Sequence, residues 1–150
     1  MLLKRIVHVA VGIAVAALNC SGTGNASISV HVLDASSGNA LSHVWVTLSV
    51  PKGTENASRL TELIHKTDSE GLVEFVLREP IPDHFGVLLG SDLVLCSNIV
   101  FPTEQVTKTG IIGNNTCDPP RFKYNESPKP GELVVFARHL NLWQRILREL

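Results

Sequence analysis

Alternating apolar and polar residues mark the first half of the chain as β-structure. Across Ile28–Leu33, apolar side chains recur at every second position, and Ser29 and His31 separate them. Because successive side chains of a strand point to opposite faces of its sheet, this period predicts a strand with one buried face. The same alternation runs through Ser42–Val50, which predicts a second strand of the same kind.

Five more segments show strand character. They are Leu60–Lys66, Leu72–Leu77, Phe85–Leu89, Leu93–Cys96 and Glu132–Ala137. Each is rich in apolar residues and is bounded by residues that favour turns. A tight hairpin at Asp68–Gly71 is expected to join the first two of these segments. The third and fourth form either one bent strand or a hairpin around Gly90–Asp92.

Three connecting segments can also be interpreted. Glu79–Pro82 contains two prolines, which cannot donate a ladder hydrogen bond, so it is predicted to be a crossover. Pro102–Gly110 begins with proline, has an acidic first turn and ends in glycine, which indicates a helix of one or two turns. Ile111–Lys129 is irregular, and we expect it to wrap the outside of the molecule, tied down by Cys117.

Together these elements predict an all-β fold, a small antiparallel β-sandwich of immunoglobulin-like or prealbumin-like type. We assign residues 27–138 to this sandwich. The length of 150 residues suits one domain, and an apolar content of 44% is typical of a globular chain. The net charge of −1 lacks the basic excess that nucleic-acid binding requires, so no nucleic-acid partner is predicted.

The N-terminal segment has the pattern of an export signal. A cationic start, Met1–Arg5, precedes the thirteen mostly apolar residues of Ile6–Leu18. A membrane span needs about 20 such residues, so this core is too short for one. We predict a signal peptide at 1–22, with cleavage between Asn19 and Ala26, and a secreted, periplasmic or envelope-associated protein without a transmembrane span. The alternative is that the segment forms a first buried strand or helix.

The three cysteines bear on the same question. Cys96 and Cys117 lie in the body of the chain, and two cysteines in an exported protein usually pair. The predicted disulfide would raise the free energy of unfolding by about 3 kcal/mol, because it closes a loop of the unfolded chain. The alternatives are two buried free thiols or one bridge to a partner. Cys20 ends the leader, and lipid attachment there is an alternative that the preceding residues 17–19 do not favour.

The last twelve residues, 139–150, are predicted to be a C-terminal amphipathic helix. Apolar residues recur with helical spacing, opposite charged and polar ones. A helix of this length is not stable alone in water, so its apolar face must rest on its own domain, a protein partner or second copy, or a membrane surface. That face consists of Leu142, Trp143, Ile146, Leu147 and Leu150.

Three segments of the first half carry a resemblance to a known family. Val30–Leu41, Val44–Leu48 and Thr67–Gly71 resemble the transthyretin-like and carboxypeptidase-regulatory-like superfamily. The resemblance covers about a third of the chain. It implies a small β-sandwich with an Asp…Gly turn after the first strand and a Thr-Asp-x-x-Gly hairpin further on. The region from Cys96 to Phe136 is similar to small exported bacterial proteins that carry this domain.

The export leader, the strand pattern and the lack of a legible catalytic set favour an exported, non-enzymatic module of this type, which acts in adhesion, protein association or envelope structure. An enzymatic alternative comes from His31–Asp34, which matches the His-Val-Leu-Asp segment of 5-hydroxyisourate hydrolases, where the histidine helps to activate water. Only His31 carries over as a catalytic residue, because that family's closing Tyr-Arg-Gly-Ser is absent. A carbohydrate-binding sandwich, using Trp45 and Tyr124, is a third hypothesis.

The histidines do not predict a metal site. Five of them follow the leader, and none forms a His-x-x-x-His pair. A pair formed by His31 and His43 on adjacent strands stays open as an alternative. Asp34–Gly38 is interpreted as a turn, because the later acidic ligands of a calcium loop are missing. No cofactor and no metal are predicted.

Overall fold

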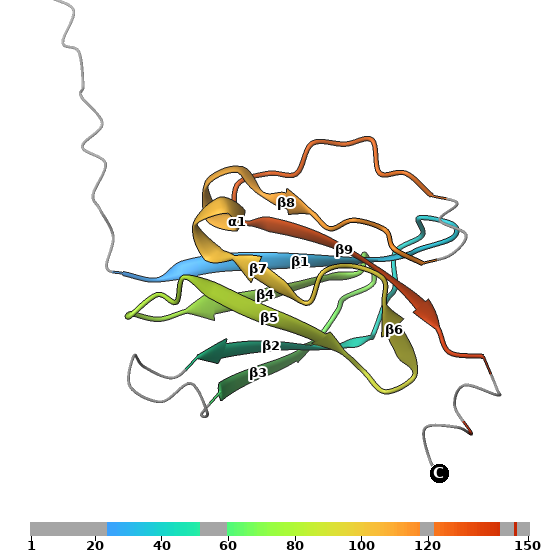
Figure 1. Ribbon diagram of the computed structural model, residues 1–150, viewed down its shortest axis with the longest axis horizontal. Coiled ribbons are helices and arrows are strands. Elements are labelled where there is room, and N and C mark those ends of the chain that lie inside the picture. The colour runs from blue at the N-terminus through green and yellow to red at the C-terminus, as the bar shows by residue number, and fades with distance from the viewer. Residues whose placement is uncertain (1–23, 52–59, 118–121, 142–145, 147–150) are drawn as a thin grey trace, which may run out of the picture.

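Two β-sheets packed face to face form the structure, a computed structural model that describes residues 24–51, 60–117, 122–141 and 146 (Figure 1). The prediction of an all-β sandwich is confirmed. The elements are β1 (Ala26–Asp34), β2 (Trp45–Pro51), β3 (Leu60–Lys66), β4 (Leu72–Leu77), β5 (His84–Leu89), β6 (Leu93–Leu95), β7 (Val100–Pro102), α1 (Thr103–Thr109), β8 (Ile111–Ile112) and β9 (Glu132–His139).

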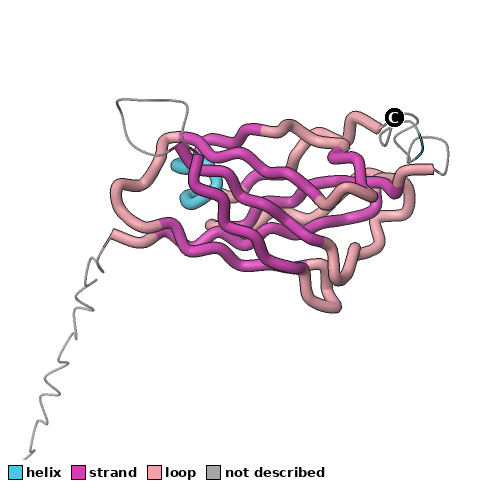
Figure 2. Tube along the Cα trace, turned by 90° about the horizontal axis from the view of Figure 1, so that it is seen from below, coloured by secondary structure: helices cyan, strands magenta, loops and turns pink. Residues whose placement is uncertain are grey.

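The order of the strands determines which edges are open. Sheet A has the order β4-β1-β9-β6, with β8 also beside β9, and sheet B has the order β3-β2-β5-β7. The pairs β1–β9 and β8–β9 are parallel, and the other pairs are antiparallel. Consecutive strands β3 and β4 therefore end different sheets. The helix α1 lies at one end of the strand layers (Figure 2).

The core consists of the residues that the alternation predicts. Ile28, Val30 and Val32 of β1 are fully buried, as are Val46 and Leu48 of β2. Each such side chain contributes about 1.5–3 kcal/mol when it leaves water. Three core phenylalanines come one each from β4, β5 and β7, and β9 supplies three further core residues.

The observed elements differ from the predicted ones at their ends. β2 begins at Trp45 rather than Ser42, because Ser42 and His43 form a turn in which His43 has a φ of 57°. β9 runs two residues past Ala137, so His139 ends a strand instead of opening a helix. The short strands β7 and β8 were not predicted, since two or three residues carry no readable period.

The predicted hairpin at Asp68–Gly71 is wrong, because β3 and β4 do not pair. The turn instead carries the chain from sheet B to sheet A. Before it, the Thr67 N–H donates to Val44 O (2.9 Å), and after it, the Val32 N–H donates to Gly71 O (2.9 Å). The two sides of the turn thus bond to different sheets, because Val44 directly precedes β2 of sheet B and Val32 lies in β1 of sheet A.

Local hydrogen bonds explain the Thr-Asp-x-x-Gly segment. The buried Thr67 hydroxyl donates to Leu41 O (2.7 Å), and Asp68 Oδ1 accepts from the N–H groups of Glu70 (2.8 Å) and Leu72 (2.9 Å). Gly71 has a φ of 73°, and a Cβ there would lie 2.8 Å from Val32 O. Only glycine both adopts this positive φ without strain and lacks the Cβ that would collide with Val32 O.

The prediction of one bent strand or a hairpin around Gly90–Asp92 is wrong, because β5 lies in sheet B and the separate strand β6 lies in sheet A. Two other connections are as predicted. Glu79–Pro82 carries the chain from β4 in sheet A to β5 in sheet B, as predicted for a crossover. The helix α1 is preceded by Pro102 and capped by Gly110, which has a φ of 74°, so the predicted short helix is confirmed.

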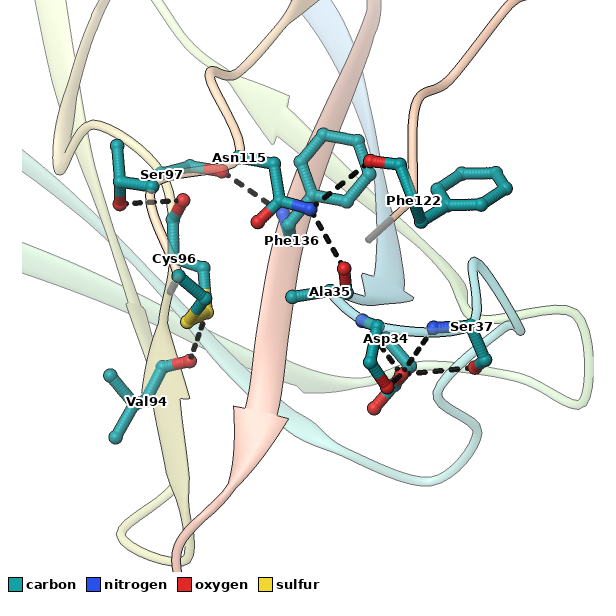
Figure 3. The surroundings of a disulfide bond; sticks show 12 residues. Asp34, Ala35, Ser37, Val94, Cys96, Ser97, Asn115, Phe122 and Phe136 are labelled. Carbon is teal, nitrogen blue, oxygen red and sulfur yellow. Dashed lines mark hydrogen bonds between the residues drawn. A yellow bond between two sulfur atoms is a disulfide. The ribbon is translucent and has the colours of Figure 1, made fainter. Parts of the chain in front are cut away.

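A second, smaller cluster covers the outer face of sheet A. Cys96 and Cys117 form the predicted disulfide there (Figure 3). The side-chain amide of Asn115 donates to Ala35 O (2.8 Å) and Phe122 O (3.3 Å), which holds the loop after β8 against the end of β1. The prediction that Ile111–Lys129 wraps the sandwich is therefore confirmed for its described residues, although Ile111–Ile112 forms the strand β8 instead of irregular structure.

Several predictions concern residues outside the described part of the chain. They are the signal peptide 1–22 with Cys20, and most of the C-terminal helix. Of residues 139–150, the structure describes His139–Asn141 and Ile146, which is helical and 43% exposed. No helix in the described ranges is long and apolar enough to cross a membrane.

Removing the disulfide should weaken the fold without changing it. We expect the double variant Cys96→Ser/Cys117→Ser to lose about 3 kcal/mol of unfolding free energy, because the cross-link restricts the unfolded chain. Urea denaturation measures this loss. A reducing agent should destabilise the wild type by a similar amount and leave the double variant unchanged; a loss below about 1 kcal/mol would contradict a structural role for the bridge.

The Asp34 turn predicts a pH dependence. Partial burial acts to raise the pKa of Asp34, but hydrogen bonds to its Oδ1 from the hydroxyl and N–H groups of Ser36 and Ser37 outweigh burial and lower the pKa. A lowered folded-state pKa stabilises the fold above the unfolded value of about 3.9, and this contribution is lost as pH falls through the folded value.

We therefore expect Asp34→Ala to cost about 1 kcal/mol of unfolding free energy at pH 7. The difference from the wild type should shrink as the pH falls below about 4. Denaturation curves between pH 2 and 7 measure it. Glu70→Ala, which alters an exposed acid of another turn, is the matched control and should show neither effect. A cost that stays constant with pH would contradict the role of the ionised carboxylate.

Candidate functional site

Among the described residues, the one ionisable side chain that the structure pairs with His31 is the carboxylate of Glu132. His31 lies on β1 with its side chain on the outer face of sheet A, and its Nδ1 is 3.9 Å from Glu132 Oε1. Its cross-strand neighbours are Leu72 of β4 and Val134 of β9. This arrangement holds one histidine near one acid and between two apolar residues.

The alternative of a His31–His43 pair is wrong. β1 pairs with β4 and β9 in sheet A, whereas His43 lies in the turn before β2 of sheet B. The two histidines are therefore not on adjacent strands. Among the described residues, no group of three or more histidine, cysteine, aspartate or glutamate side chains is arranged to hold a metal ion.

The two aromatic residues considered for carbohydrate binding lie on different sheets. Trp45 is half exposed on the outer face of sheet B, with Lys66 Nζ 4.5 Å from the centre of its ring. Tyr124 packs partly buried against the cluster outside sheet A, where burial and the nearby Glu126 raise the pKa of its hydroxyl. They do not form one aromatic surface.

A groove runs along the open side of the sandwich, between β3 and β4. It encloses about 530 Å³. At one end of the groove, the ring of His65 packs edge-on against Phe75 with centroids 5.2 Å apart. We call this feature the β3/β4 groove. Its walls are Val50, Pro51, Thr61, Leu63 and His65 from sheet B, and Glu74, Val76, Leu77, Arg78, Pro80 and Pro82 from β4 and the crossover.

One wall of the β3/β4 groove is a sheet edge with open backbone groups. Val32 and Gly71 form a hydrogen-bonded pair in the β1–β4 register, and such pairs alternate along antiparallel strands. Val73, Phe75 and Leu77 are therefore the residues of β4 whose N–H and C=O groups form hydrogen bonds with β1. The residues between them direct their N–H and C=O groups away from β1.

Glu74 and Val76 are the outward-directed residues of β4 whose backbone groups stay open. The third such residue, Leu72, is already bonded, because the Asp68 N–H donates to Leu72 O (2.8 Å) and the Leu72 N–H donates to Asp68 Oδ1. At Glu74 and Val76 no strand within the described ranges pairs with this edge. An open edge of this kind is a template for a further strand.

The apolar and charged side chains of the groove are separated in space. Leu63 and Leu77 lie on the inner faces of β3 and β4 and give it an apolar floor. Val76 is 54% exposed on the rim, which is unusual for a strand valine. Glu74 and Arg78 stand on either side of Val76, so the rim carries a negative and a positive end.

Sequence reasoning missed this site. The alternation identifies β3 and β4 as strands, but it does not say which strands end the two sheets. One signal is present in hindsight: Val76 is an apolar residue at a position that the alternation of β4 assigns to the solvent.

Comparison with known proteins adds no relative from which a site could be transferred. No protein-family model, no curated protein and no solved structure matches this chain.

Proposed function

We propose that this protein is an exported, non-enzymatic β-sandwich module of the transthyretin-like or carboxypeptidase-regulatory type. Its function is to bind a segment of another protein in the β3/β4 groove. The observation that carries this proposal is the apolar groove beside the open N–H and C=O groups of Glu74 and Val76. The disulfide also supports it, because such bonds persist in oxidising compartments outside the cytosol.

A polypeptide is the ligand class that suits both halves of the groove. Open backbone groups of a sheet edge are best satisfied by another backbone, and side-chain pockets beside the edge supply specificity. A carbohydrate or a small acid would leave the apolar floor unfilled. The prealbumin-like or immunoglobulin-like type of the sandwich belongs to this proposal and rests on the resemblance alone.

The hydrolase alternative has less support, because general acid–base catalysis needs convergent groups around a substrate pocket. His31 is paired with Glu132 between Leu72 and Val134. A 5-hydroxyisourate turnover assay decides between the two functions. We expect no turnover by the full chain, and activity that disappears in His31→Ala would contradict the proposal.

Proline substitution tests the role of the β4 edge. The Val76 N–H points away from β1, so Val76→Pro removes an open donor and leaves the β1–β4 ladder intact. Linear nine-residue peptides selected on the full chain from a phage-displayed library serve as probes. We expect their affinity to fall at least tenfold in Val76→Pro, measured by fluorescence anisotropy.

Glu62→Pro is the matched control for this experiment. Glu62 lies on β3, and its N–H points to the open edge of sheet B rather than to β2. The Glu62→Pro variant should bind the selected peptides with wild-type affinity. Equal binding to the wild type and to a Val76→Pro variant with unchanged melting temperature would refute the groove as the binding site.

Export is tested by the mass of the mature protein. Expressed in a bacterial host with its own N-terminus, the chain should be recovered from the periplasm shortened by cleavage between Asn19 and Ala26. Its intact mass should rise by about 2 Da on reduction of the Cys96–Cys117 bridge. An uncleaved chain in the cytosol would contradict the export part of the proposal.

A further inference from the structure

We infer that the bound segment is an extended strand that adds to β4 in antiparallel direction and carries an acid, three apolar residues and a base, in that order. This inference rests on the proposed function and specifies its ligand. The charge pattern of the β4 edge and the apolar floor of the groove lead to it.

The charge pattern comes from two residues on the outer face of β4 and the residue that directly follows the strand. Glu74 and Val76 alternate with the inward-facing Phe75 and Leu77, and Arg78 continues the chain just past the end of β4. At about 3.3 Å per residue, the two charges are about 13 Å apart along the edge. Neither charge takes part in an ion pair within the described part of the chain. Both are therefore available to a ligand.

The preferences of cross-strand pairs predict which ligand residues lie opposite these three positions. Residues directly opposite each other on neighbouring strands have Cβ atoms about 4.5–5.5 Å apart, and opposite charges there attract. A strand added to β4 therefore places a base opposite Glu74, an apolar residue opposite Val76 and an acid opposite Arg78. These are alternate positions of the ligand.

The two intervening ligand residues point toward the other side of the added strand. That side faces the groove, whose floor includes Val50, Leu63 and Leu77. Apolar side chains at these two positions would cover that floor, and burial of apolar surface drives their binding. The ligand core thus has three apolar residues between its charges.

The direction of the ligand fixes the order of the charges. Antiparallel pairs are somewhat more stable per residue than parallel ones, and β4 already pairs in this way with β1. An antiparallel ligand runs from Arg78 toward Glu74, so the acid precedes the base. A parallel ligand would need the opposite order.

Two synthetic peptides with flanking serines test the inference. One has the core Glu-Val-Val-Ile-Lys and the other the core Lys-Val-Val-Ile-Glu. We expect the full chain to bind the acid-first peptide about tenfold more tightly in fluorescence anisotropy. The double variant Glu74→Lys/Arg78→Glu should reverse this preference, and both of its positions are exposed, so the fold should be unaffected.

The other outcomes separate this inference from the proposed function. Equal affinity for the two peptides, lost in Val76→Pro, would overturn the charge register and leave strand addition standing. Tighter binding of the base-first peptide would overturn the antiparallel direction. If neither peptide binds while library peptides do, the ligand pattern is wrong; if library peptides fail as well, the proposed function fails with it.

Discussion

The fold depends on the insertion of β9 between β1 and the short strands β6 and β8. This pairing joins the first and last described strands of the sandwich, so forming it has an entropic cost of loop closure. Residues Leu133–Ala137 are buried on both faces of the sheet. The main core covers the inner face, and the cluster around the Cys96–Cys117 bridge covers the outer one. Two-sided burial of β9 offsets the entropic cost of pairing it with β1.

The position of β9 also explains the open side of the molecule. With β9 and β1 in the centre of sheet A, β4 is left at its edge, and β3 is left at the edge of sheet B. The turn at Asp68–Gly71 brings these edge strands together without pairing them. The proposed binding groove is therefore a consequence of the same topology that stabilises the core.

Much of the fold could be predicted from the sequence, because burial of one strand face leaves a period of two. The alternation identified the buried residues of β1 and β2, and the run Leu133–Ala137 identified the closing strand. The strand order could not be predicted in this way, since Thr67–Gly71 has the same turn chemistry whether it joins paired strands or two sheets. The groove depends on that order, and so it was missed.

The open β4 edge is the central claim, and residue-resolved amide hydrogen exchange of the free protein tests it most directly. The account predicts slow exchange at Val73, Phe75 and Leu77, whose N–H groups bond to β1, and fast exchange at Glu74 and Val76. Uniform protection along β4 would contradict it, because the edge would then be covered in the free protein and closed to a further strand.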